Sequence, residues 1–138
     1  MKMRFNHLSI DEVFKLLTQF NSDLNKFFAQ YLQQEYSDLE KERLYYLDIA
    51  EIGRFIISNI ETKTHIFTNF FVQVELILSN CDTDIENLVV VGLFESLQNS
   101  SSGKVDYHTY FDKWLLPVSK DKWNRLIDQW EGQKLTRD

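Results

Sequence analysis

The chain has 138 residues and a formal charge of −6, from 15 basic and 21 acidic residues. Its length predicts one domain over residues 1–138, and its 43% hydrophobic and 26% charged content excludes a disordered chain. The negative charge argues against nucleic acid and anionic membranes as partners and is compatible with a basic protein partner.

The predicted compartment is the cytoplasm. Cys81 is the single cysteine, so no internal disulfide is possible, and a lone thiol fits a reducing environment. The N-terminal segment MKMRFNHLSIDEVF has no apolar run long enough for the core of a signal peptide. The longer apolar segments are interrupted well short of the ~20 residues that a membrane span needs.

The first two predicted helices are amphipathic. Ser9 and Glu12 have the spacing of a capping box, in which each side chain satisfies the other's free backbone amide. Apolar residues then follow at single-face helical spacing as far as Phe20. Asn21 to Asp23 ends this helix and caps the next, which fades at Glu35.

A third helix is predicted to start at a second capping box, Ser37 to Glu40, and to carry an isoleucine-rich stripe as far as Ile60. Gly53 lies inside that stripe. A glycine within a helix costs roughly 1 kcal/mol relative to alanine, so the position suggests either the close approach of another helix or a tolerated defect.

The fourth and fifth predicted helices lie in the segment Thr64–Gly103. The fourth has a phenylalanine-rich stripe and stops near Cys81, and its aromatic residues are expected in the core. The fifth follows a third capping box, Thr83 to Glu86, and runs to about Leu97. Its apolar run could also form a strand, but its length and cap favour a helix buried on several sides. Gly92 in this helix suggests close helix contact.

A mobile loop is predicted over residues 98–104, because the segment is rich in serine and ends in glycine. A sixth helix is expected from Tyr107 to Leu115 and is ended by Pro117. Ser119 then caps a seventh helix that stops at Gly132, and residues 133–138 form a frayed tail. The predicted fold is therefore all-α, with about seven helices in antiparallel hairpins, as a bundle or a short α-solenoid-like stack.

Few residues suggest chemistry. His108 lies near Asp106 and Asp112, which could form a base–acid pair, but acids near a helix start with a surface histidine are the commoner explanation. Cys81 follows a helix and has no nearby histidine to lower its pKa. No metal-ligand motif or glycine-rich phosphate loop is present. We expect no catalytic residue, no cofactor and no metal, and hence no enzyme.

The negative charge at the centre of the chain is not balanced by basic residues. The segment Thr64–Gly103 contains five acids and no lysine or arginine. A field of one sign attracts an oppositely charged partner and accelerates its association. Acids at a helix start also stabilise the helix dipole, so part of the cluster has a purely structural explanation. Both interpretations stay open; the predicted partner-binding residues are Glu75, Asp82, Asp84, Glu86 and Glu95.

The region from about Arg43 to Gly132 resembles a group of small α-helical bacterial immunity proteins of contact-dependent and polymorphic toxin systems. The residues that carry the resemblance are Asn87 to Asn99 (NLVVVGLFESLQN), Phe111 to Leu115, Trp123, and Trp130-Glu131-Gly132. They are mainly core residues, so no catalytic residue is carried over.

The resemblance implies an intracellular inhibitor that binds one secreted toxin domain and blocks it. Many such toxins are nucleases, which must be basic to hold phosphates, and an anionic inhibitor could occupy that surface. The sequence also allows a helical adaptor or regulatory scaffold with an unrelated protein partner. An enzyme would require His108 and its neighbouring acids to line a deep pocket.

Overall fold

A computed structural model describes residues 7–38, 40–62 and 65–136. Within these ranges the chain contains helices and turns and no strand, which confirms the all-α prediction. No described helix combines the length and apolar character needed to cross a bilayer. The elements are α1 (Ile10–Thr18), α2 (Ser22–Glu35), α3 (Tyr45–Ser58), α4 (His65–Leu78), α5 (Thr83–Asn87), the π-helix η1 (Leu88–Phe94), α6 (Glu95–Ser101) and α7 (Pro117–Thr136).

Two predicted helix starts are confirmed. Ser9 Oγ accepts the Glu12 amide at 3.2 Å while Glu12 Oε1 accepts the Ser9 amide at 2.9 Å, which completes the capping box of α1. Asn21 Oδ1 caps α2 by accepting the Leu24 amide at 3.0 Å. The prediction for α5 is off by one residue, because its N-cap is Asp82 rather than Thr83.

The predicted start of the third helix at Ser37 is wrong. The helix begins at Tyr45, and its N-cap residue Leu44 makes no side-chain capping bond. The Leu44 amide instead donates to the Tyr36 hydroxyl at 2.8 Å, so the segment before α3 is tied back to the end of α2. A tertiary contact therefore overrides the local capping signal; Leu39, inside the predicted box, lies outside the described residues.

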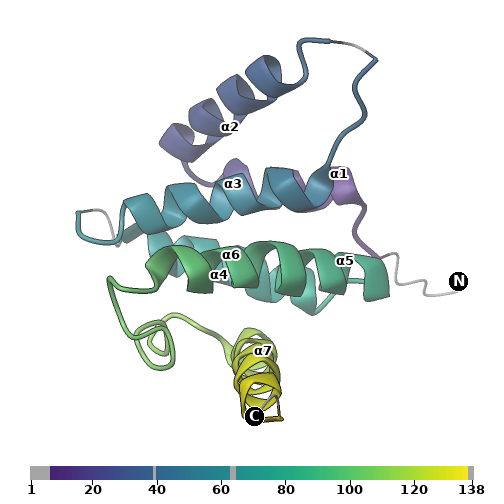
Figure 1. Cartoon of the computed structure of the whole chain (residues 1–138). Coiled ribbons are helices and arrows are strands. Elements are labelled where there is room, and N and C mark those ends of the chain that lie inside the picture. The colour runs from purple at the N-terminus through teal and green to yellow at the C-terminus, as the bar shows by residue number, and fades with distance from the viewer. Residues whose placement is uncertain (1–6, 39, 63–64, 137–138) are drawn as a thin grey trace, which may run out of the picture.

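The predicted fifth helix exists as one continuous helix formed by α5, η1 and α6. It runs parallel to α3, because Gly92 faces Ile49 at one level and Gly53 faces Ser96 further along both helices. A Cβ atom on Gly92 would lie 2.6 Å from Ile49 Cγ2, and one on Gly53 would lie 2.8 Å from Ser96 Oγ. Both glycines thus permit close helix approach. Since α4 separates the two helices in sequence, this pair is not an antiparallel hairpin (Figure 1).

The predicted loop over residues 98–104 is wrong in its first half. Gln98 and Ser101 belong to α6 and are buried, and Ser101 Oγ donates to the Gln98 carbonyl at 3.2 Å. A turn follows, in which Gly103 has φ +85°, a value that favours glycine. The serine-rich composition misled the prediction because the Ser101 and Gln98 side chains donate to backbone carbonyls within the fold, those of Gln98 and Trp123.

The predicted sixth helix does not form. Residues 107–114 are a succession of turns, and Asp106 Oδ1 accepts the His108 amide at 3.1 Å, a local bond that competes with helix formation. Pro117 does not end a helix but is the first residue of α7, where a missing amide costs nothing. The described residues therefore contain six continuous helices, close to the predicted number of about seven.

The predicted end of the last helix is also wrong. Ser119 lies inside α7 rather than capping it, and α7 continues through Gly132 to Thr136. The frayed tail predicted over residues 133–138 is thus helical as far as Thr136, and residues 137–138 lie outside the described residues.

The core lies between α3, α4 and the α5–η1–α6 helix, and α7 crosses beneath them, nearly end-on in Figure 1. Aromatic side chains fill it, as predicted for α4. Trp123 of α7 is fully buried, with its ring 5.2 Å from Phe94 and 5.1 Å from Phe111. The largest fully buried side chains are Trp123, Phe67, Phe70, Phe71, Phe94 and Phe111.

Candidate functional site

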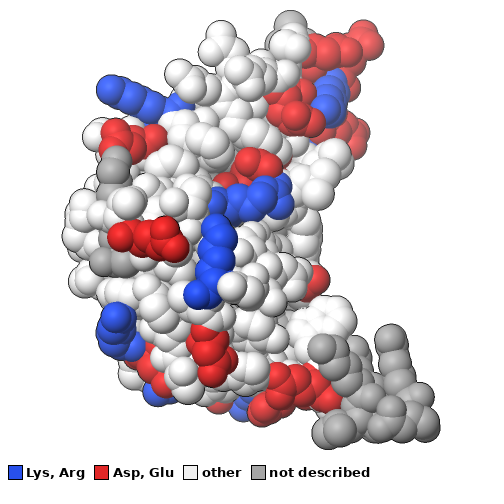
Figure 2. Space-filling model, turned by 60° about the vertical axis from the view of Figure 1, so that its left-hand side comes forward, with Lys and Arg blue, Asp and Glu red and all other residues white. Residues whose placement is uncertain are grey.

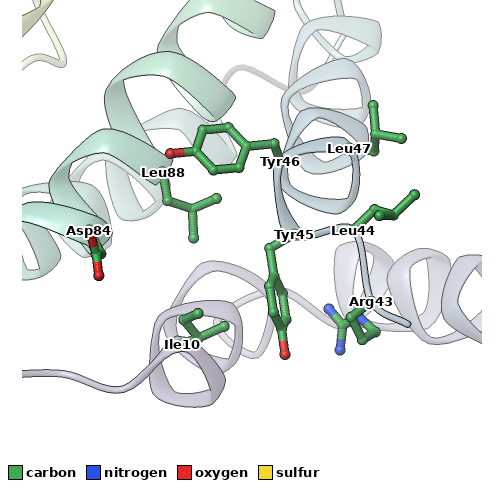
Figure 3. Close-up of a pocket in the computed structure, with 8 residues that line it drawn as sticks. All are labelled: Ile10, Arg43, Leu44, Tyr45, Tyr46, Leu47, Asp84 and Leu88. Carbon is green, nitrogen blue, oxygen red and sulfur yellow. The ribbon is translucent and has the colours of Figure 1, made fainter. Parts of the chain in front are cut away.

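An open pocket lies between the N-terminal half of α3 and the α5–η1 segment. Its volume is about 490 Å³. The Tyr46 ring reaches from α3 toward Leu88, while Tyr45 points to Ile10 of α1, and Asp84 lies on the side away from Leu47 (Figure 3). The lining residues are Ile10, Arg43, Leu44, Tyr45, Tyr46, Leu47, Asp84 and Leu88.

A second hollow of about 260 Å³ continues this pocket along the same two helices. It shares Tyr46 and Leu47 with the first and extends past Val91 to Glu95. We call the two hollows together, from Asp84 to Glu95, the α3–η1 groove. Its large apolar side chains are unusually exposed: Leu47 is 58% exposed, Leu44 48%, Tyr46 47% and Val91 46%. The groove therefore exposes several large apolar side chains to solvent.

The π-helix shapes one wall of the groove. The Glu95 amide donates to the Val90 carbonyl, five residues back, which is the defining bond of a π-turn. Val89 and Leu93 stay in the core while Val91 faces outward. Such turns often occur at functional sites.

A buried charge network holds the other wall. Asp48 is fully buried; its Oδ2 accepts from Arg43 Nε at 2.7 Å, and its Oδ1 accepts from the hydroxyls of Tyr31 and Tyr36, each at 2.7 Å. Burial, followed by the hydrogen bond to Asp48, raises the pKa of Tyr31, and burial is also the main cause that raises the pKa of Tyr36. Both tyrosines therefore remain neutral donors.

The Arg43 side chain lies among aromatic rings at the edge of the groove. Its guanidinium is 4.9 Å from the Tyr45 ring centre and 5.2 Å from that of Phe14. The Arg43 Nη2 atom is buried and has no hydrogen-bond partner among the described residues, so contact with ring faces stabilises the cation instead. The network fixes the segment that presents Leu44 and Leu47.

Three of the five predicted partner-binding acids make contacts within the fold. Glu75 accepts from the amides of Val118 and Ser119 and from the Ser119 hydroxyl, at 2.7–3.0 Å, and so caps α7 from α4. Burial acts to raise the Glu75 pKa, but these hydrogen bonds outweigh it and the pKa is lowered. Asp82 caps its own helix at 2.9 Å, and Glu86 pairs with Lys122 at 3.2 Å.

The other two acids are free. Neither the Asp84 nor the Glu95 carboxylate has an ion pair or hydrogen bond with another described residue, and they border opposite ends of the α3–η1 groove. The structure thus brings two of the five together at one surface. On the face in Figure 2, acidic and basic side chains are interspersed, so the acids there form no continuous area.

The histidine cluster lies on an open surface. His108 Nδ1 is 2.7 Å from Asp106 Oδ1, its Nε2 contacts Glu131, and its side chain is 44% exposed. Hydrogen bonds to Glu131 and then Asp106 raise the His108 pKa. Asp112, the other predicted partner, faces Lys120 at 3.8 Å instead. The enzyme alternative requires a deep pocket around His108, whereas this side chain is partly exposed.

The remaining candidate groups are Cys81 and the potential metal ligands. Burial raises the pKa of the Cys81 thiol, and neighbouring acids add to that effect, so a nucleophilic thiolate is disfavoured. Within the described ranges, no group of three potential ligands could hold a metal ion.

The sequence prediction missed the apolar part of the groove. Leu44 and Leu47 fall outside the isoleucine stripe of α3. Apolar residues off the core-facing stripe are expected at the surface, and this pattern could have indicated the groove. Asp48 was missed too, although it stands four residues before the buried Ile52 and therefore on the core side of α3.

Comparison with protein families relates the chain to a known family. The model of a family described as a domain of unknown function (DUF7674) matches residues 14–131. No curated protein and no solved structure is significantly similar to the chain.

Proposed function

The chain belongs to the DUF7674 family, whose description assigns no function, and we propose that it acts by binding another protein in a stoichiometric complex. The proposed partner is a toxin domain, which we expect to be encoded beside the chain, and the chain would then be an immunity protein that works in the cytoplasm. The α3–η1 groove is the proposed contact surface. The observation that carries this proposal is the combination of exposed apolar residues with two free carboxylates at the ends of one groove.

The apolar part of the groove suits protein binding. Binding energy at an interface concentrates in a few large side chains that become fully desolvated, often aromatic ones. Tyr46 and Leu47 stand at the centre of the groove, where both hollows meet. The Asp48–Arg43 network and the Gly92 contact hold them on rigid helices, which reduces the entropy lost on binding.

The unpaired charges of the groove support a basic partner. Arg43 and Arg54 also line the groove, but they pair with Asp48 and Glu51, so the carboxylates without an ion pair are those of Asp84 and Glu95. Asp84 and Glu95 would each gain a cationic neighbour in a complex with a basic protein, and the net charge of −6 adds long-range attraction. A nuclease toxin has such a basic surface because it must hold phosphates. The resemblance to immunity proteins favours the same partner.

Co-expression with the product of the neighbouring reading frame tests the proposal. We expect the chain to restore growth of cells that make the toxin domain and to copurify with it at equal stoichiometry. Absence of both protection and a complex would contradict the proposed function. A complex with a regulatory protein of the same operon, without protection, would support an adaptor instead.

A matched pair of leucine variants tests the surface. Leu47→Ala removes an exposed apolar contact in the groove and should weaken the complex about 10-fold. Leu76→Ala removes a similarly exposed leucine, which is 45% exposed on α4 and borders a different hollow; it should leave affinity unchanged. Equal affinities of the two variants would show that the partner binds elsewhere.

A further inference from the structure

A smaller pocket lies beyond Glu95, between α6 and α7. Its volume is about 220 Å³, below the ~300–1000 Å³ typical of small-molecule sites, so it suits one side chain. Trp130 and Tyr107 supply two aromatic walls, and the Trp130 side chain is 45% exposed. The polar residues of the lining are Glu95, Gln98 and Asn99.

The polar groups of this pocket are positioned by buried contacts. Gln98 is only 5% exposed, and its Nε2 donates to the Trp123 carbonyl at 3.5 Å, so its oxygen is the atom left to accept from a ligand. The Tyr107 carbonyl accepts from Trp123 Nε1 at 3.0 Å, which fixes the backbone of the Tyr107 wall. Ile127, which is buried, completes the apolar lining.

The charged group in the described lining of the pocket is the Glu95 carboxylate. Arg54 lines the neighbouring hollow that Glu95 also borders, where Arg54 pairs with Glu51. Glu95 has no partner among the described residues, and no lysine or arginine is part of the described lining. Beside the pocket, His108 stacks on Tyr107 with ring centres 4.8 Å apart and is held between Asp106 and Glu131. Two carboxylates around one imidazole leave a net negative charge even when His108 is protonated.

From this arrangement we propose that the pocket binds one arginine side chain of the partner. A guanidinium is planar and can stack on Trp130 and Tyr107 while it donates to Glu95 and to the Gln98 oxygen. Lysine offers a point charge without the planar face and would bind more weakly. The inference rests on the proposed function, since it specifies a basic residue that the partner would insert beside the α3–η1 groove.

Nuclear magnetic resonance of the full chain tests this pocket directly. The probe is Nα-acetyl-L-arginine methylamide, and the neutral control is the corresponding citrulline compound, which has the same length and planar head. We expect saturable shifts of the Trp130 indole and Gln98 amide signals with the arginine compound, in the millimolar range. The citrulline compound should bind roughly 10-fold more weakly because it lacks the charge.

Two variants separate a specific contact from general attraction. Glu95→Gln should weaken arginine binding roughly 10-fold, while Asp128→Asn, which removes an exposed carboxylate of α7 that does not line the pocket, should retain it. Equal binding of citrulline, or unchanged binding by Glu95→Gln, would overturn the inference. If the arginine compound fails to bind while the toxin complex forms, only this pocket is wrong; if it binds and no complex forms, only the proposed function fails.

Discussion

Asp48 illustrates how one buried residue sets the geometry of a surface. It is fully buried and joins Arg43, Tyr31 and Tyr36 beneath the groove. Replacing it with asparagine leaves Arg43 without its counter-charge, and breaking a buried ion pair from one side costs about 3–5 kcal/mol. Urea unfolding should therefore show a large loss of stability for Asp48→Asn.

Glu51 provides the matched control for this prediction. It pairs with Arg54 on the exposed face of the same helix, and exposed pairs contribute about 1 kcal/mol or less. The free energy of unfolding of Glu51→Gln should thus differ from that of the natural protein by about 1 kcal/mol or less. Similar losses for the two variants would contradict the importance assigned to the buried network.

Replacing two glycines by alanine should change the stability of the fold in opposite directions. A Cβ on Gly92 would lie 2.6 Å from Ile49 Cγ2, so Gly92→Ala requires repacking that costs about 1–3 kcal/mol. The higher helix propensity of alanine returns about 1 kcal/mol at most, so the variant should be less stable. Gly132 has open space around it inside α7, so Gly132→Ala should stabilise by up to about 1 kcal/mol. Thermal unfolding measures both; a stabilising Gly92→Ala would show that the helices are not in close contact.

At the scale of elements, the sequence predicted helices where apolar periodicity and capping agree. α1, α2 and α4 have single-face stripes and were found, and Gly53 and Gly92 indicated close approach correctly. The prediction failed where contacts between elements determine where a helix begins. The segment before α3 is fixed by Tyr36 and Asp48, which bond to Leu44 and Arg43 at separations of eight and five residues that match no helix-capping pattern. The π-turn in η1 likewise left no distinct signal in an apolar run.

Glu75 of α4 bonds to the start of α7, and its ionisation should make the stability of the fold depend on pH. Its hydrogen bonds to the start of α7 lower its pKa in the folded state, so the stabilisation is complete above the unfolded pKa of about 4.3 and is lost as pH falls through the lower folded value. Glu75→Gln should cost about 1–3 kcal/mol near pH 7, and this difference should shrink on acidification. Urea unfolding at several pH values measures it.

Glu40 serves as the control for that series. It is exposed, and no side-chain contact of its carboxylate occurs within the described residues. Glu40→Gln should leave stability unchanged across the same pH range. A Glu75→Gln difference that stays constant as pH falls would contradict a role for the ionised carboxylate at α7.

For the whole molecule, counting charges along the sequence predicted only part of the candidate site. The segment Thr64–Gly103 contains no basic residue, yet folding brings Lys122 to Glu86 and the start of α7 to Glu75. Counting charges within one segment therefore gave too many unpaired acids, because folding supplies partners from other parts of the chain. What remains free, Asp84 and Glu95, lies beside apolar residues of α3 that come from a different part of the chain.

The central claim is that the α3–η1 groove, with its two free carboxylates, receives a basic protein. The most direct test is the association rate with the neighbouring toxin domain for the double variant Asp84→Lys/Glu95→Lys, compared with Glu61→Lys/Asp128→Lys, which changes the net charge equally away from the groove. Between about 0.1 M and 1 M salt, the Debye length falls from about 10 Å to about 3 Å. We predict that the groove variant associates several-fold more slowly than the control at low salt and that the gap narrows at high salt. Equal rates for the two variants at low salt would contradict the account.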